Sequence, residues 1–80
     1  MTRIVWADPV RDLFLDLPET DRNRILEHLI YLLRFLHLYP ARTRGRFRRH
    51  RWFRAGNWVV YYRVAGGVVY IRGLWPARIP

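Results

Sequence analysis

Two β-rich segments, and the basic strand from His50 to Ala55 before them, are joined by two short glycine turns that constrain the fold of this chain more than any other feature. Trp58 to Val64 and Val68 to Arg72 are rich in β-branched and aromatic residues, which favour strands. Gly66-Gly67 separates them, and Gly56-Asn57 precedes the first; both pairs are typical of two-residue hairpin loops. The second half of the chain, entered through the basic connector 41–49, is therefore predicted to form an antiparallel meander.

Two-residue loops also predict which residues pair and which face each side chain takes. The expected pairs are Ala65 with Val68, Arg63 with Tyr70, Tyr61 with Arg72, Ala55 with Trp58, Phe53 with Val60, Trp52 with Tyr61 and His50 with Arg63. Side chains alternate along a strand, so a slip of one residue would reverse both faces. The face expected to back onto the helices holds Phe53, Val60, Tyr62, Val64, Val69 and Ile71. The opposite face collects His50, Trp52, Arg54, Val59, Tyr61, Arg63, Tyr70 and Arg72.

The first half predicts a short strand over Arg3 to Trp6, followed by two helices. Asp8 is expected to cap the first helix, with Pro9 in its first turn, where a missing N–H costs nothing. This helix is expected to end near Leu17-Pro18. The second helix is predicted to begin between residues 18 and 21 and to close at Tyr39-Pro40, because a residue before proline avoids the helical region.

The second helix carries two neighbouring apolar stripes, Ile25, Leu29, Leu32 and Leu36 in one and Leu26, Ile30 and Leu33 in the other. Together they are wider than one core contact requires in so small a domain. The spare face therefore needs cover from the sheet, from a second copy or from a partner protein.

Charge is segregated along the chain. All 15 basic residues are arginine and the net charge is +9. The six acidic residues lie within the first 27 positions, whereas His28 onward contains eleven arginines and no acid. A field of one sign favours an external polyanion such as nucleic acid, an acidic protein or a membrane surface. A surface charged only for solubility normally mixes signs.

Length and composition bound the class of protein. Eighty residues make one domain, residues 1–80, and 51% hydrophobic residues make unaided folding plausible. The absence of cysteine excludes disulfides and thiolate metal sites. No stretch resembles a signal peptide or a membrane span, so we expect a cytoplasmic protein without a membrane partner.

The basic and aromatic face suits single-stranded nucleic acid. Arginine binds phosphate bidentately and aromatic rings stack on unpaired bases. The expected nucleic-acid-binding residues are Arg48, Arg49, Arg51, Trp52 and Arg63. The alternative interpretation is ordinary cross-strand pairing that covers the outside of a sheet.

RNA cleavage would need proton carriers as well as positive charge. Arg54 and Arg72 supply charge, but arginine stays protonated. His50 is the titratable group near neutral pH on this face, whereas His28 and His37 are expected to be ordinary helix residues. The face has no carboxylate, so we expect neither a metal nor a cofactor.

The order of elements then points to a family. A strand, two helices, a basic strand, "RAGNWVVYYRV", a Gly-Gly turn and "VVYIRGLWPARIP" resemble the RelE/ParE superfamily of toxins from type II toxin-antitoxin systems. The likeness covers nearly the whole chain, and "DLFLDLPETDRNRILEHL" looks like the family's helical hairpin. It implies an α+β fold with two N-terminal helices packed on a twisted antiparallel sheet, which the short N-terminal strand joins.

The resemblance implies two activities: mRNA cleavage in the ribosomal A site, or poisoning of DNA gyrase. Arg54 matches the family's arginine before the turn and Arg72 on the last strand is a second match. Arg54 with His50, Tyr61 and Arg78 is an alternative set, so the expected catalytic residues are Arg54, His50, Arg72, Tyr61 and Arg78. The chain departs from the ribonuclease branch at its C-terminal stretch, which lacks a histidine or tyrosine, and at the basic strand, where His50 and Trp52 replace lysines. We expect a growth-inhibiting toxin that cleaves mRNA; a gyrase poison and a non-toxic binding relic are the alternatives.

The resemblance also implies a partner. The expected partner is an acidic antitoxin that wraps the toxin, and the residues expected to bind it are Leu29, Leu33 and Leu36 on the second helix.

Overall fold

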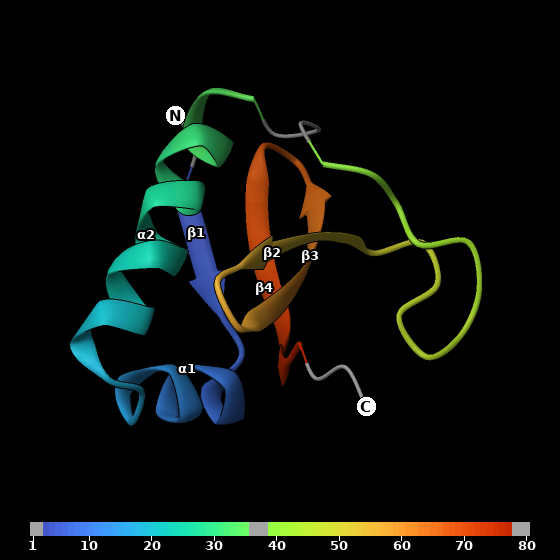
Figure 1. Ribbon diagram of the computed structural model, residues 1–80. Helices are drawn as coiled ribbons and strands as arrows, with labels where there is room; N and C mark the ends of the chain where they lie inside the picture. The colour runs from blue at the N-terminus through green and yellow to red at the C-terminus, as the bar shows by residue number, and fades with distance from the viewer. Residues whose placement is uncertain (1–2, 36–38, 78–80) are drawn as a thin grey trace.

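The structure, a computed structural model, describes residues 3–35 and 39–77 as an α+β fold of two helices and one four-stranded sheet (Figure 1). The elements in chain order are β1 (Arg3–Trp6), α1 (Asp8–Leu15), α2 (Glu19–Arg34), β2 (Arg51–Ala55), β3 (Trp58–Ala65) and β4 (Val68–Pro76). The predicted order of elements is confirmed.

The sheet is mixed rather than wholly antiparallel. Its strand order is β1-β4-β3-β2, with β2, β3 and β4 antiparallel and β1 parallel to β4. The expectation of an antiparallel sheet is therefore wrong at this one edge. Parallel strands need a long crossover connection, and β1 and β4 have one, because both helices and two strands lie between them.

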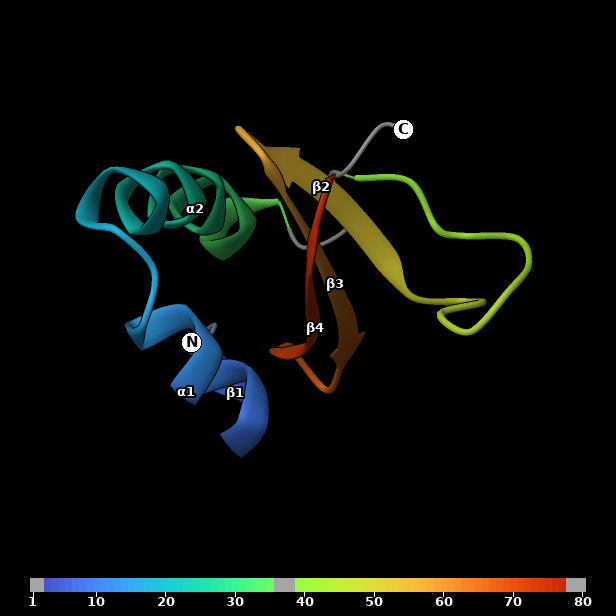
Figure 2. The ribbon, with the colours of Figure 1, turned by 60° about the horizontal axis from the view of Figure 1, so that its bottom comes forward.

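The two helices cover one face of the sheet, and the segment that precedes β2 lies on the opposite side (Figures 1 and 2). The six side chains predicted to face the helices belong to the core or pack against it, because five are buried and Val64 is partly buried. The buried hydrophobic residues are Phe14, Leu17, Ile25, Leu29, Leu32, Phe53, Ala55, Val60, Tyr62, Val69, Ile71 and Leu74. Both glycine turns pair as predicted, Ala55 with Trp58 and Ala65 with Val68.

The start of α1 differs by one residue from the prediction. Ala7, not Asp8, is the N-cap, and no side chain caps the helix. Asp8 instead lies beside Pro9 in the first turn, where its negative charge interacts favourably with the helix dipole. The helix ends at Leu15, slightly before the predicted end.

Helix α2 ends at Arg34, about a turn before the predicted stop at Tyr39. Phe35 leaves the helical backbone at φ −125° and ψ 78°. Tyr39 instead returns to the core, where its ring lies 5.1 Å from that of Phe53. No helix within the described ranges is long and apolar enough to cross a membrane.

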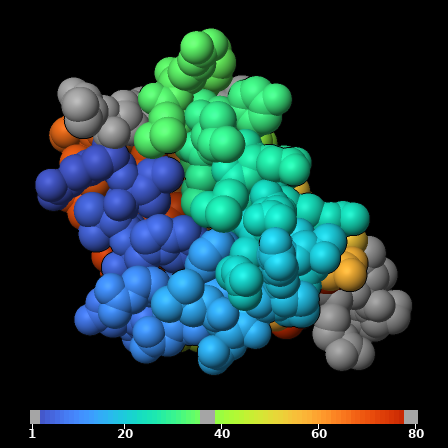
Figure 3. All heavy atoms as spheres, turned by 90° about the vertical axis from the view of Figure 1, so that its left-hand side faces the viewer, coloured from blue at the N-terminus to red at the C-terminus, as the bar shows by residue number. Residues whose placement is uncertain are grey.

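One apolar stripe of α2 is buried and the other is exposed. Ile25, Leu29 and Leu32 of the first stripe are buried against the sheet, and Leu36 lies outside the described residues. The second stripe, Leu26, Ile30 and Leu33, is exposed; we call it the outward stripe of α2. Figure 3 views the molecule from the side of the helices, and α2 lies open on this face.

Candidate nucleic-acid interface

The outer face of the sheet, opposite the helices, carries most of the basic and aromatic side chains predicted to share a face. Trp52 pairs with Tyr61, and Arg63 pairs with Tyr70, as expected. On β1, Val5 pairs with Tyr70 and joins the same face. His50 precedes β2 and is not in the ladder, so its predicted pairing with Arg63 does not form.

A β-bulge in β4 changes the residue opposite Tyr61. The register shifts between Tyr61 and Tyr62, so that Tyr62 pairs with Ile71 whereas Tyr61 pairs with Gly73. Arg72 is the extra residue on β4, and the predicted Tyr61–Arg72 pair is therefore wrong. The bulge keeps Leu74 on the buried face and brings Trp75 opposite Val59 on the outer face.

Gly73 creates a slot on the outer face, and Phe47 fills it. A Cβ atom on Gly73 would lie 2.6 Å from Phe47 Cζ, so only glycine leaves room for the ring. Phe47 stacks on Tyr61 with centroids 4.2 Å apart and planes 10° apart, and it meets Trp75 edge-on at 6.4 Å. The segment 41–50, which we call the arginine loop, is thereby anchored on the sheet.

The backbone of the arginine loop closes like a hairpin. The Arg42 amide donates to the His50 carbonyl and the Arg49 amide donates to the Arg42 carbonyl, both at 2.8 Å, while Ala41 bridges Arg51. Arg49 has a φ of 72°, a left-handed conformation that costs a non-glycine residue on the order of 1 kcal/mol. The loop is thus a folded unit that holds its arginines in place.

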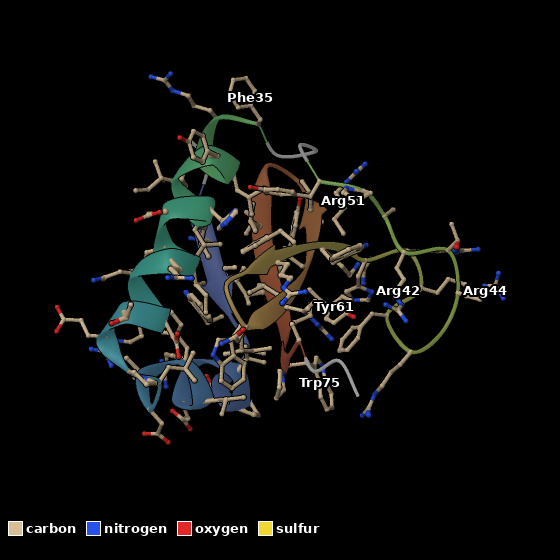
Figure 4. The ribbon with its side chains drawn as sticks, in the orientation of Figure 1. Phe35, Arg42, Arg44, Arg51, Tyr61 and Trp75 are labelled. Atoms are coloured by element: carbon tan, nitrogen blue, oxygen red, sulfur yellow. The ribbon has the colours of Figure 1, made fainter. Side chains whose placement is uncertain are left out.

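Two arginines of the loop lie over the aromatic cluster. The Arg42 guanidinium donates from Nη1 to the Tyr61 hydroxyl at 3.1 Å, and Arg46 lies over the Trp75 ring at 5.8 Å. Figure 4 shows Arg42, Tyr61 and Trp75 on the side of the sheet away from α2. With Phe47, these residues line a shallow cavity of about 240 Å³.

A second cavity, where the arginine loop enters β2, is lined mainly by arginines. It has a volume of about 440 Å³ and its lining is Arg48, Arg49, His50, Arg51, Arg63 and Val64. The predicted nucleic-acid-binding arginines thus gather around one cavity, although Arg51 also donates to the Tyr39 carbonyl at 2.6 Å. Guanidinium groups converging without a carboxylate suit a phosphate.

The predicted catalytic residues do not form one compact group. His50 and Tyr61 both contact Phe47, at centroid distances of 5.4 and 4.2 Å. Arg54 folds over the β2–β3 turn, where its Nε donates to the Gly56 carbonyl at 2.8 Å. Arg72 shares a separate cavity with Arg63 and Tyr70, and Arg78 lies outside the described residues.

The three residues predicted to bind an antitoxin do not form one surface either. Leu29 is only 3% exposed and packs in the core, so this assignment is corrected: its side chain cannot contact a partner in the folded chain. Leu33 lies on the outward stripe of α2, and Leu36 is outside the described residues.

An apolar groove lies elsewhere, between α1 and the end of β4. Its volume is about 440 Å³, its apolar walls include Val10, Leu13, Trp58 and Trp75, and Arg46 and Arg72 also line it. An apolar groove with two cations in its wall suits an amphipathic acidic segment.

His28 has a structural role, as predicted. Its ring stacks on Phe53 at 4.9 Å and its Nδ1 lies 2.8 Å from the Tyr39 hydroxyl. His37 falls outside the described ranges. Within residues 3–35 and 39–77, no group of three or more His, Cys, Asp or Glu side chains could hold a metal ion.

Sequence reasoning missed the aromatic half of this interface. Arg42, Arg46, Phe47 and Trp75 were not expected to contribute, because nothing local predicts that the arginine loop folds back onto the sheet. Gly73 could have indicated this contact, since a glycine inside a strand often marks a β-bulge or a place where another part of the chain approaches closely.

The geometry defines an α+β domain whose exposed sheet face combines arginines with stacked rings. Comparison of the chain with protein-family models, with curated proteins and with solved structures finds no match.

Proposed function

We propose that the protein binds single-stranded RNA on the outer face of its sheet. The observation that carries the proposal is the adjacency of the basic cavity and the aromatic cluster, which share the arginine loop. Phosphates would be held by Arg48, Arg49 and Arg63, and bases would stack on the exposed part of Trp75, which is 45% exposed. Among the described residues the ion pair found is Asp8 with Arg11, so Arg48, Arg49 and Arg63 form no ion pair there.

We further propose that this binding serves a growth-inhibiting toxin of the RelE/ParE kind that acts on mRNA at the ribosome. The support is the sequence resemblance together with the order of elements and the placement of both helices on one face of the sheet. His50 and Tyr61 are the proton carriers closest to the proposed RNA path, and the surrounding arginines would stabilise the charge that develops on phosphate.

A second candidate is a toxin that poisons DNA gyrase without cleaving RNA. The observation in its favour is the dispersal of the expected catalytic set: Arg54 is bound to the Gly56 carbonyl, and the Tyr61 hydroxyl accepts from Arg42. Among the described side chains of the outer face, His50 then has no assembled acid partner. A non-toxic relic that retains only binding is the third alternative.

The antitoxin is proposed to be an acidic segment in the apolar groove between α1 and β4. There Arg46 and Arg72 would pair with its carboxylates while Leu13, Trp58 and Trp75 take its apolar side chains. This location replaces the α2 stripe expected from the sequence, because Leu29 is buried.

RNA binding is tested by the affinity of a fluorescein-labelled oligouridine over a series of salt concentrations. We expect Arg48→Ala, Arg49→Ala and Arg63→Ala each to reduce the slope of log K against log salt by about 0.7, the value for one phosphate contact on a single strand. Arg11→Ala on α1 removes the same charge from the helical side and should leave the slope unchanged. Equal effects of all four substitutions would show that only net charge matters.

The mode of toxicity is tested by induction in cells. Growth arrest with cleavage of ribosome-bound mRNA that is lost in His50→Ala supports the nuclease, whereas arrest with gyrase-dependent DNA breaks supports the second candidate. Full cleavage by the double variant His50→Ala/Arg54→Ala would refute the proposed catalytic residues.

A further inference from the structure

The outward stripe of α2 has a pattern that is symmetric about its middle. Leu26 and Leu33 flank Ile30, and the exposed fractions of the three are 42%, 42% and 63%. Glu27 directly follows Leu26, and Arg34 directly follows Leu33. At 100° per residue, Glu27 and Arg34 fall within about 20° of each other on one flank of the stripe. Read from either end, the helix presents leucine, isoleucine, leucine, with opposite charges at the two ends.

Such a pattern is complementary to itself when two copies run antiparallel. A two-fold axis beside Ile30 would place this residue against Ile30 of the second copy, and Leu26 against Leu33 of the second copy. The same axis keeps the charged flanks on one side, so Glu27 would meet Arg34 of the second copy, and this pair occurs twice. A parallel two-fold arrangement would instead place the charged flanks of the two copies on opposite sides of the contact, where Glu27 and Arg34 would not meet.

We propose that the protein forms a homodimer by antiparallel pairing of the outward stripes of α2. Neither charge has another partner in the part of the chain that the structure describes, where the ion pair found is Asp8 with Arg11 at 3.9 Å. No other element lies over α2 in the view from the helical side (Figure 3), and all three side chains of the stripe are exposed. The dimer would bury the exposed apolar side chains and satisfy the two charges together.

The distribution of charge over the whole molecule is compatible with this dimer. Two copies that each carry +9 repel each other, but the acidic residues lie on the helical side. The arginine loop lies on the far side of the sheet from α2 (Figure 1), so pairing through α2 keeps the two arginine loops apart. It also leaves both nucleic-acid interfaces open.

The expected association is weak. Helix α2 has 16 residues and spans about 24 Å, and one pair of such helices buries less than the roughly 800 Å² per partner of a standard interface. We therefore expect a dissociation constant on the order of 10 µM. An apolar helix of another protein could occupy the same stripe, but the reversed charges at its two ends favour a second copy.

Cross-linking tests the geometry directly, because the chain has no cysteine. We expect Ile30→Cys to be converted to a covalent dimer by a short bismaleimide, since the axis brings this position close to its copy. Leu15→Cys is the matched control; Leu15 is equally exposed, at 59%, but lies on α1 outside the stripe. Equal cross-linking of the two variants, or none of Ile30→Cys above the proposed dissociation constant, would overturn the proposal.

Charge reversal tests the pairing of the flanks by sedimentation equilibrium. Glu27→Arg or Arg34→Glu alone creates two like-charged contacts and should weaken the dimer by about tenfold, whereas the double variant restores the pairs and should return to within about twofold of wild type. Ile30→Glu should be monomeric and keep both its circular dichroism and its affinity for RNA. A wild-type mass of one chain at all concentrations, or a double variant weaker than either single one, would contradict the antiparallel dimer.

Discussion

Gly73 is the residue that allows the arginine loop to reach the sheet. Its φ lies outside the left-handed region, so its importance comes from the missing side chain rather than from backbone freedom. A methyl group there would collide with Phe47, whose ring already stacks on Tyr61. One hydrogen atom in place of a methyl group thus decides where the arginines lie.

We expect Gly73→Ala to lower the free energy of unfolding by about 1–3 kcal/mol, the usual cost of overpacking. Denaturant unfolding measures the change. In a Phe47→Ala background the collision is absent, so the same substitution should cost less than about 0.5 kcal/mol. An undiminished cost in that background would place the strain somewhere other than the slot.

Tyr62 is a second residue whose environment predicts a measurable effect, here on the pH dependence of stability. Its side chain is 0% exposed, and its hydroxyl has no hydrogen-bond partner among the described residues. Burial raises the pKa of Tyr62 above the ordinary 10.0, and the positive charge of Arg51 opposes this only in part. The phenol therefore stays protonated in the folded state at a pH where the unfolded chain would lose the proton.

The sign of the pH dependence follows from that difference in pKa. Above pH 10.0 the unfolded state releases a proton that the folded state retains, so stability falls as the pH rises. Tyr62→Phe should fall less steeply, while at neutral pH it should match wild type or exceed it by up to about 1 kcal/mol. Urea unfolding from pH 7 to 11 checks both expectations; a steeper alkaline loss in Tyr62→Phe would refute them.

Among the elements, the arginine loop has Phe47 as the ring that packs it onto the sheet, beside the contacts of Arg42 and Arg46. Phe47→Ala should release the loop and expose its arginines to trypsin, with cleavage within residues 42–49 about tenfold faster for a loss of about 1.4 kcal/mol in local stability. Phe35→Ala removes another aromatic ring, 56% exposed at the end of α2, and should leave the rate unchanged. Unaltered cleavage of Phe47→Ala would show that the backbone hydrogen bonds alone hold the loop.

The strands show what local sequence determines. Two-residue glycine turns fix the pairing near each turn, so the separation of apolar from basic side chains in β2 and β3 is predictable from alternation alone. The bulge at Arg72 is harder to predict from alternation, because packing accommodates the extra residue. Leu74 stays in the core, and Gly73 makes room for Phe47. Tyr61 therefore meets Gly73 instead of a second arginine.

The ends of helices and the path of loops depend on distant contacts. The proline rule predicted that α2 would continue to Tyr39, but the chain leaves the helix at Phe35 and brings the Tyr39 ring against Phe53 and His28. The arginine loop folds onto residues that come 14 to 28 positions later, such as Tyr61 and Trp75. Such tertiary contacts leave no periodic trace in the sequence.

At the scale of the whole molecule, the fold separates two kinds of surface. The helical side holds the acids and the outward stripe of α2, and the other side of the sheet holds the arginine loop and the stacked rings. Because α2 and the arginine loop do not share a face, a second copy on one side and RNA on the other would not compete. The acidic N-terminal segment and the basic C-terminal segment of the sequence thus lie on opposite sides of the sheet.

The parallel pairing of β1 with β4 bears on how the chain is synthesised. The strand nearest the start of the chain lies beside the last strand, and β4 also joins β1 to β3. A nascent polypeptide can form its helices early, but it cannot complete its sheet until Pro76 has emerged, and pairing over so long a separation is slow. An activity that needs the finished sheet would begin only after translation of its own message had reached the final strand.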